Sequence, residues 1–202
     1  IVVSPRANWL NKKTINAAKK ANSIIKNIKV FSSLEDAISN FTYVIATTNR
    51  KRYLEKKSTS DFKYLKNKIN SYKKSAILFG PENSGLSNED LNLADIIFSI
   101  NTSNQNNSLN LSHAVSILCY KIFELNNLKN NTNLKSKLTY INKSQLSKYF
   151  DYLFLNLENR GFFTPKEKKT SMKNNIYAIF TKSPLTKKEL QTLWGITKKL
   201  TK

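Results

Sequence analysis

The sequence predicts an α/β fold in which helices cover both faces of a mostly parallel sheet. Three short apolar runs, at residues 42–47, 75–79 and 96–100, have the composition of buried strands. Helical patterns separate these runs along the chain, and strands that alternate with helices usually lie parallel in one sheet. Residues 145–202 carry helical patterns and no convincing strand, which predicts a small C-terminal helical module.

The N-terminal part is expected to begin with a buried strand at residues 1–3 and to contain a second short strand at 30–31. Between them, residues 11–21 have the pattern of a helix, because three apolar side chains share the spacing of one helix face. These side chains are Ile15, Ala18 and Ala21. Further along, we expect a lysine-rich amphipathic helix over 60–74 and a longer helix over 109–125.

Polar residues mark the starts of three helices. Ser33 and Ser87 each precede acidic residues in a first helical turn, where a hydroxyl can cap the free N–H groups and the helix dipole favours a carboxylate. Thr186 lies just after Pro184 and has Glu189 three positions later, which is the spacing of a capping box.

Composition divides the chain into three parts. We expect a domain over 1–125, a linker over 126–144 and a helical extension over 145–202. The linker is rich in Asn and Lys with few apolar positions, which is typical of a flexible connection. The extension should hold three helices, with apolar positions at Leu146, Tyr149, Phe150, Leu153 and Leu157, at Met172, Ile176, Ile179 and Phe180, and at Leu190, Leu193, Trp194 and Leu200.

The chain has 34 Lys and Arg residues against 13 Asp and Glu, a formal net charge of +21. Positive charge spread over the whole chain attracts polyanions, mainly through phosphates. A genome rich in A and T also inflates Lys, Asn and Ile, so part of the excess has this second explanation. No apolar run approaches the roughly 20 residues that span a bilayer, and no signal-peptide pattern is present.

The single cysteine, Cys119, rules out an intramolecular disulfide and agrees with a reducing cytoplasm. Because it falls on an apolar helix, we expect a buried, unreactive thiol. The Cys and His spacings of a zinc site, a P-loop, a dinucleotide glycine fingerprint and a hydrolase nucleophile elbow are all missing from the sequence. We therefore expect no metal ion.

The first motif is Phe79-Gly80-Pro81-Glu82-Asn83-Ser84-Gly85-Leu86, directly after a predicted strand. Gly80 would allow the backbone to approach a ligand, and Gly85 would permit a turn that other residues resist. The Glu82 carboxylate could orient a hydroxyl or shape the loop. The alternative is an ordinary junction between a strand and a helix.

The second motif, Asn107-Ser108-Leu109-Asn110, opens the helix over 109–125. Free N–H groups at a helix start suit an anion, and Ser108 and Asn110 add short hydrogen-bonding side chains. The alternative is capping of the helix by Asn107 or Ser108. His113 is the only histidine; a general-base role is conceivable, but we expect a partly buried structural residue.

The third element is the polar and basic stretch after the strand at 42–47, namely Thr47-Thr48-Asn49-Arg50-Lys51-Arg52. Its hydroxyls and amide could line the edge of the same pocket as the other two motifs, while its cations could meet phosphate. The alternative is a solvated loop.

In this order and at this separation, the first two motifs resemble motifs 2 and 3 of the SpoU/TrmH RNA 2′-O-methyltransferases, which belong to the SPOUT class. The likeness is closest to the TrmJ-like branch and includes the tail at Ile179-Phe180-Thr181-Lys182. It implies a SPOUT-type parallel sheet with a C-terminal trefoil knot, a homodimer, and S-adenosyl-L-methionine as cofactor. It also implies tRNA as partner, with an anticodon-loop cytidine or uridine as the usual target.

The resemblance assigns roles by position. The cofactor-binding residues it implies are Thr47, Thr48, Asn49, Gly80, Ile100, Ser108, Leu109 and Asn110. The residues implied near the reacting ribose are Glu82, Ser108 and Asn110, which we take as the catalytic candidates. The RNA-binding candidates are Arg50, Lys51 and Arg52.

One family feature is missing. Motif 1, an Asn-x-Gly-like stretch with an arginine that activates the ribose hydroxyl, should precede Ile1, and we expect that the chain is truncated there. If it is not, a catalytically silent RNA-binding protein with a SPOUT-like core is the alternative. A general polyanion binder, driven by charge alone, is a third possibility.

Overall fold

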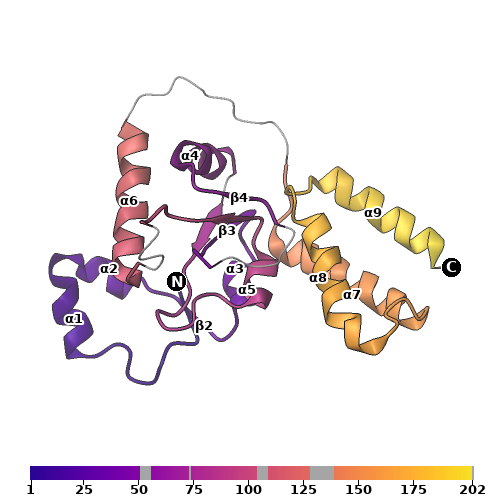
Figure 1. The fold of residues 1–202 in the computed structure, drawn as a ribbon, viewed down its shortest axis with the longest axis horizontal. Coiled ribbons are helices and arrows are strands. Elements are labelled where there is room, and N and C mark those ends of the chain that lie inside the picture. The colour runs from indigo at the N-terminus through magenta and orange to yellow at the C-terminus, as the bar shows by residue number, and fades with distance from the viewer. Residues whose placement is uncertain (51–55, 73, 104–108, 128–138, 202) are drawn as a thin grey trace.

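The centre of the computed structural model is a parallel sheet of four strands in the order β4-β6-β3-β5 (Figure 1). The strands are β3 (Tyr43–Thr47), β4 (Ser58–Thr59), β5 (Ser75–Leu78) and β6 (Ile96–Phe98). The structure describes residues 1–50, 56–72, 74–103, 109–127 and 139–201. The prediction of a parallel sheet is confirmed, since the three predicted runs form β3, β5 and β6.

β3 is a central strand of this sheet. Its Val44, Ile45 and Ala46 side chains are each 0% exposed. The strand pairs in parallel with β5 on one side and β6 on the other, so that Ile45 lies opposite Ile77 and Ile96. Because the strands run in one direction, their carboxyl ends meet at a single edge, which is where open α/β sheets bind ligands.

Helices cover both faces of the sheet, as predicted (Figure 1). They are α3 (Leu34–Ile38), α4 (Phe62–Ser71), α5 (Asn88–Leu93) and α6 (Leu111–Asn127). Alternate side chains of β3 point to opposite faces. Val44 and Ala46 belong to the apolar cluster with α3 and α5, whereas Tyr43 and Ile45 belong to the cluster with α4 and α6.

The first thirty-one residues form a separate two-stranded parallel sheet with short helices. Its elements are β1 (Val2–Val3), α1 (Lys12–Ala18), the 3-10 turn η1 (Lys19–Ala21), α2 (Asn22–Lys26) and β2 (Val30–Phe31). The prediction that residues 1–3 are buried was wrong, since Ile1 is 58% exposed and Val2 and Val3 are only partly buried. Among the described residues, β1 pairs only with β2 and is not part of the four-stranded sheet.

α6 differs from its prediction in two respects. It begins at Leu111 rather than at residue 109. His113 and Cys119, expected to be partly buried and buried, are both exposed. Leu118, at 1% exposure, marks the face that packs on the sheet, and the other two side chains project away from that face.

Three helices follow in the C-terminal part, at the predicted positions (Figure 1). They are α7 (Lys143–Asn159), α8 (Lys169–Phe180), which follows the 3-10 turn η2 (Lys166–Lys168), and α9 (Lys187–Leu200). Their shared core includes Tyr149, Phe150 and Leu190, all at most 7% exposed. The Tyr149 hydroxyl hydrogen-bonds the Thr197 hydroxyl at 3.0 Å, so α7 and α9 are joined by a polar contact as well.

The predicted helix caps are present. The Ser33 hydroxyl accepts a hydrogen bond from the Asp36 N–H (3.1 Å) at the start of α3. Ser87 begins α5 with a capping box. Thr186 and Glu189 form the same arrangement at the start of α9. Local spacing therefore predicted these helix starts correctly.

The stretch expected as a linker, 126–144, is bounded differently in the structure. α6 extends to Asn127, and α7 begins at Lys143. Ile141 is 4% exposed, and Tyr140 forms an antiparallel bridge with Thr186. The last residues of this stretch thus pack within the helical part, while the division of the chain into three domains stays a prediction.

Candidate active site

A cavity of about 750 Å³ opens at the carboxyl edge of the sheet. Loops after β3, β5 and β6 surround it together with the start of α6. The lining residues are Thr47, Thr48, Asn49, Arg50, Phe79, Gly80, Pro81, Glu82, Gly85, Phe98, Ile100, Thr102, Leu109, Leu111 and Ala114. Ligand pockets usually measure roughly 300–1,000 Å³, so this cavity is large enough for a nucleoside-sized molecule.

The end of β3 is tied to both neighbouring strands. The Thr47 hydroxyl donates to the Leu78 carbonyl of β5 at 2.7 Å. The Thr48 N–H donates to the Phe98 carbonyl of β6 at 3.2 Å. These bonds fix the position at which the chain leaves the sheet and enters the cavity wall.

The loop after β3 then reaches the other two loops. The Asn49 amide donates to the Thr102 hydroxyl, beyond β6, at 3.3 Å. The Arg50 guanidinium donates to the Asn83 carbonyl, beyond β5, at 3.3 Å. Three segments far apart in the sequence are therefore joined by hydrogen bonds around one opening.

Gly80 allows the loop after β5 to fold back on itself. A Cβ at this position would lie 2.2 Å from the Leu86 nitrogen and 2.3 Å from the Gly85 carbonyl carbon, distances that no side chain tolerates. Gly85 completes the turn with φ +67°, in the left-handed region that favours glycine. Glycine is therefore required at position 80 because two parts of the loop touch there. Gly80 also lines the cavity.

Asn110 connects the second motif to the first. Its Oδ1 accepts hydrogen bonds from the Ser112 N–H (2.9 Å) and the Ser112 hydroxyl (2.6 Å), and its carbonyl accepts the N–H of Ala114 (3.0 Å). Its Nδ2 donates to Glu82 Oε1. Asn110 therefore caps the first turn of α6, which begins at Leu111. Asn107 and Ser108, the alternative caps, lie outside the described residues.

The structure brings most of the predicted site residues together. Those that line the cavity are Thr47, Thr48, Asn49, Arg50, Gly80, Glu82, Ile100 and Leu109, and Asn110 adjoins it through Glu82. Ser108, Lys51 and Arg52 lie outside the described residues. The catalytic, cofactor-binding and RNA-binding roles of all these residues stay predictions.

Sequence reasoning missed several residues of the cavity wall. Phe98 and Thr102 flank the predicted Ile100, and the i, i+3 spacing of Leu111 and Ala114 on the first turn of α6 could have indicated one helix face toward the cavity. It also missed Ser112, whose two contacts with Asn110 depend on the exact start of the helix.

The model of the SpoU rRNA Methylase family matches residues 1–120, more than half of the chain. This chain belongs to the SpoU rRNA methylase family. The predicted resemblance to SpoU-type RNA methyltransferases is confirmed, and with it the prediction that the chain is an enzyme of RNA methylation.

Several relatives of this SpoU-family chain are similar over most of its length. An uncharacterized tRNA/rRNA methyltransferase of Haemophilus influenzae is 30% identical over 200 residues, covering 96% of this chain and 80% of the relative. The tRNA (cytidine-2′-O-)-methyltransferase TrmJ of Methanocaldococcus jannaschii is 30% identical over 177 residues, covering 86% and 73%. The crystal structure of TrmJ from Z. mobilis superimposes with a TM-score of 0.86 at 26% identity, covering 99% and 85%.

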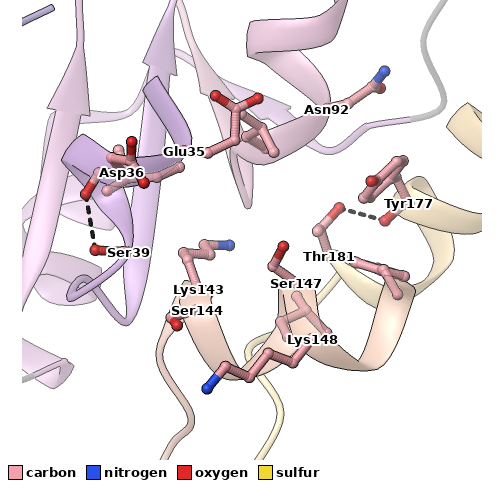
Figure 2. A pocket seen from close by; sticks show the side chains of 14 residues that line it. Glu35, Asp36, Ser39, Asn92, Lys143, Ser144, Ser147, Lys148, Tyr177 and Thr181 are labelled. Atoms are coloured by element: carbon pink, nitrogen blue, oxygen red, sulfur yellow. Dashed lines mark hydrogen bonds between the residues drawn. The ribbon is translucent and has the colours of Figure 1, made fainter. Parts of the chain in front are cut away.

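A second cavity, of about 320 Å³, lies where the part with the sheet meets the helical part (Figure 2). Glu35 and Asp36 of α3 line one side of it, Lys143 and Lys148 of α7 line another, and α8 closes a third side. It contains none of the residues predicted for the site and is away from the carboxyl ends of the strands. We therefore take the strand-end cavity as the candidate active site.

Beside this second cavity, α7 is joined to the sheet by a buried ion pair. Lys143 Nζ lies 2.6 Å from Asp95 Oδ1, and the two side chains are 11% and 2% exposed. The other carboxylate oxygen of Asp95 accepts the N–H of Val44 in β3 at 2.7 Å. The first residue of α7 thus contacts the carboxylate that holds the start of the central strand.

Lys56 makes a second connection at this junction. Its Nζ donates to the carbonyl of Asn92 (2.8 Å), to that of Ala94 and to the hydroxyl of Thr181 (2.9 Å) at the end of α8. Burial lowers the pKa of Lys56 to about 7, and the charge of Lys143 acts in the same direction.

Proposed function

We propose that this chain is an S-adenosyl-L-methionine-dependent methyltransferase that modifies a ribose 2′-hydroxyl of tRNA. The observation that carries the proposal is the convergence of three strand-end loops on one cavity, with Glu82 and Asn110 bonded to each other at its wall. Relatives named as tRNA 2′-O-methyltransferases, 25–30% identical over most of this chain, support the same substrate class.

The cavity wall fits the proposed cofactor. Adenosine needs an apolar slot with a few hydrogen-bonding groups, and the wall combines Ile100 and Leu109 with the polar ends of Thr48 and Asn49. Gly80 presents backbone without a side chain beside this slot. When bound, the cofactor supplies an electrophilic methyl group on a sulfonium; the knotted backbone expected for the family would enclose it and belongs to the same proposal.

The contribution of the protein to the reaction would be positioning and electrostatics. A ribose hydroxyl is a poor nucleophile, so its oxygen must be held in line with the methyl carbon while its proton is drawn away. Glu82 is a carboxylate whose orientation Asn110 fixes, and it could accept the hydrogen bond of that hydroxyl. We assign Ser108 and Asn110 to the same task of holding the ribose.

The tRNA would be held mainly through its phosphates, which position an RNA without specifying its sequence. Arg50 lies at the cavity and Lys51 and Arg52 follow it in the sequence, and the formal charge of +21 supplies a general attraction. We extend the proposal to a cytidine or uridine of the anticodon loop, as in the TrmJ-like branch, and to a cytoplasmic enzyme. In the described part of the chain, no helix could span a membrane.

A homodimer is part of the proposal as well. α6 carries Ile117, Tyr120 and Phe123 at i, i+3 spacing on the side away from the sheet, and they are 36%, 60% and 63% exposed. Exposed apolar side chains in a row on one helix face are typical of an interface. A second copy of α6 is the partner that we propose.

The test is methyl transfer from labelled S-adenosyl-L-methionine to bulk tRNA. Wild type should transfer label to an alkali-resistant dinucleotide, because a methylated 2′-oxygen cannot attack the neighbouring phosphate. Asn110→Ala should lower the rate by on the order of 100-fold, the typical cost of losing a group that contacts the transition state. Asn126→Ala, an exposed asparagine at the other end of α6, is the matched control and should retain full activity.

The silent RNA-binding alternative predicts a different result. Calorimetry would then detect no saturable binding of S-adenosyl-L-methionine, while tRNA would still bind. The general polyanion binder predicts no methyl transfer by wild type and tRNA binding that Asn110→Ala leaves unchanged. Methylation that continues unchanged in Asn110→Ala would instead reject the assigned site.

A further inference from the structure

The Asn110 amide has a defined orientation in the structure. Its oxygen accepts two hydrogen bonds from Ser112, one from the N–H at 2.9 Å and one from the hydroxyl at 2.6 Å. Its nitrogen donates to Glu82 Oε1. The amide therefore joins the first turn of α6 to the loop after β5.

The opposite orientation of this amide would be unfavourable at both ends. It would place an NH₂ group against the two donors of Ser112 and a carbonyl oxygen against the Glu82 carboxylate. The Ser112 N–H supports the observed orientation in any variant, because it belongs to the backbone. The hydroxyl is the second support, and it is the one that depends on the residue type.

We propose that Ser112 is a positioning residue for methyl transfer. This inference rests on the proposed function. The Ser112 hydroxyl holds the Asn110 amide, the amide holds Glu82 through its N–H, and Glu82 meets the ribose hydroxyl. Ser112 itself contacts neither the cofactor nor the RNA in this scheme, so its effect should appear in the rate of the chemical step and not in binding.

A matched pair of serines tests the proposal. Ser116 lies one turn further along α6, and its hydroxyl donates to the Ser112 carbonyl at 2.9 Å without a contact to Asn110. Ser112→Ala should lower kcat by about 3- to 10-fold, the usual worth of one neutral hydrogen bond. The KM for tRNA and the calorimetric Kd for S-adenosyl-L-methionine should stay unchanged. Ser116→Ala should change none of these values.

Two further variants separate positioning from simple stabilisation of the helix. Ser112→Thr keeps the hydroxyl and should restore kcat. Ser112→Ala added to Asn110→Ala should cause no further loss, because its effect passes through the Asn110 amide. Thermal unfolding of each variant checks that the fold is retained.

Several results would overturn the proposal. An unchanged kcat in Ser112→Ala would do so, as would a loss confined to KM, a failure of Ser112→Thr to restore the rate, or independent losses that multiply in the double variant. If Asn110→Ala were itself fully active, the assigned site would fail together with this inference. If Asn110→Ala were inactive and Ser112→Ala unaffected, only the role of Ser112 would be rejected.

Discussion

Gly80 is the residue of the candidate site with the least room for change. Gly80→Ala would place a methyl group 2.2 Å from the Leu86 nitrogen, which is backbone and cannot rotate away. The loop after β5 would have to move, and overpacking of this kind usually costs about 1–3 kcal/mol. We expect a lower melting temperature and at least about tenfold weaker S-adenosyl-L-methionine binding by calorimetry, because each 1.4 kcal/mol is a factor of ten.

Gly195 offers the matched control. It lies within α9, where an added Cβ meets nothing within 4 Å. Alanine is favoured over glycine inside a helix, so Gly195→Ala should stabilise the protein by about 0.5–1 kcal/mol in urea unfolding and leave cofactor binding unchanged. Equal effects of the two substitutions would contradict the steric role of Gly80.

The sequence allowed most of the cavity wall to be predicted, because a strand that ends in polar residues is a local pattern. Thr47, Gly80 and Glu82 were found in this way. The bond between Glu82 and Asn110 joins positions 28 residues apart and depends on how α6 approaches the sheet, which no local pattern contains. The same limit explains the wrong expectation for Cys119, since a helix can be apolar on average and still expose one side.

At the scale of elements, α7 is attached to the sheet through the Lys143–Asp95 pair. Removing one partner of a buried pair leaves a charge without compensation and usually costs about 3–5 kcal/mol. Lys143→Met should therefore lower the free energy of unfolding substantially, as measured in urea. Lys148→Met, which removes an exposed lysine of the same helix, should have little effect.

A second substitution tests whether the unpaired charge of Asp95 causes the loss of stability in Lys143→Met. Asp95→Asn removes the charge, but its amide oxygen can still accept the Val44 N–H. The double variant Asp95→Asn with Lys143→Met should be more stable than Lys143→Met alone, since no unpaired charge remains. If the double variant were the less stable of the two, the ion pair would not explain the loss.

Lys56 makes the stability of the junction dependent on pH. Its pKa is about 7 in the folded protein against an ordinary value of 10.5, so between these values the unfolded chain binds the additional proton. The contribution of Lys56 to stability should thus rise as the pH rises from 7 to 10.5, and it should be constant below 7. Lys56→Met should lack this rise, so wild type gains stability relative to the variant at alkaline pH.

Urea unfolding of wild type and Lys56→Met across this pH range measures the difference. Lys57→Met, which removes the exposed neighbouring lysine, is the control for the loss of a positive charge at this place. A constant difference for Lys56→Met would show that its amine titrates as it does in the unfolded chain.

Helix starts were predictable at this scale, while contacts between elements were not. Ser33, Ser87 and Thr186 act within one turn of chain, so spacing alone identifies them. Lys56 and Lys143 looked like ordinary surface lysines in a basic sequence. Their partners lie far away in the sequence: Lys56 donates to the Asn92 carbonyl and to the Thr181 hydroxyl, and Lys143 pairs with Asp95.

For the whole molecule, the charge of +21 predicts strongly salt-dependent RNA binding. Each phosphate contact releases counterions, so affinity for tRNA should fall at least about tenfold between roughly 50 and 200 mM salt. Filter binding measures this change. Calorimetry with S-adenosyl-L-methionine over the same range should give a nearly constant Kd, because we propose that this ligand binds in the strand-end cavity without releasing the counterions of an RNA. A tRNA affinity that does not change with salt would contradict the proposal that the positive charge binds RNA phosphates.

Asp95 connects the sheet part of the molecule to its helical part, so cutting the chain between them removes a stabilising contact from both. A polypeptide ended after Asn127 would keep this carboxylate and lose the cation beside it, and Lys56 would lose the Thr181 hydroxyl. The excised helices would carry Lys143 without its counter-charge. In deletion mutants that separate these two parts, a loss of tRNA affinity could therefore result from poor folding. Substitutions of surface residues in the intact polypeptide are the safer way to find which residues bind tRNA.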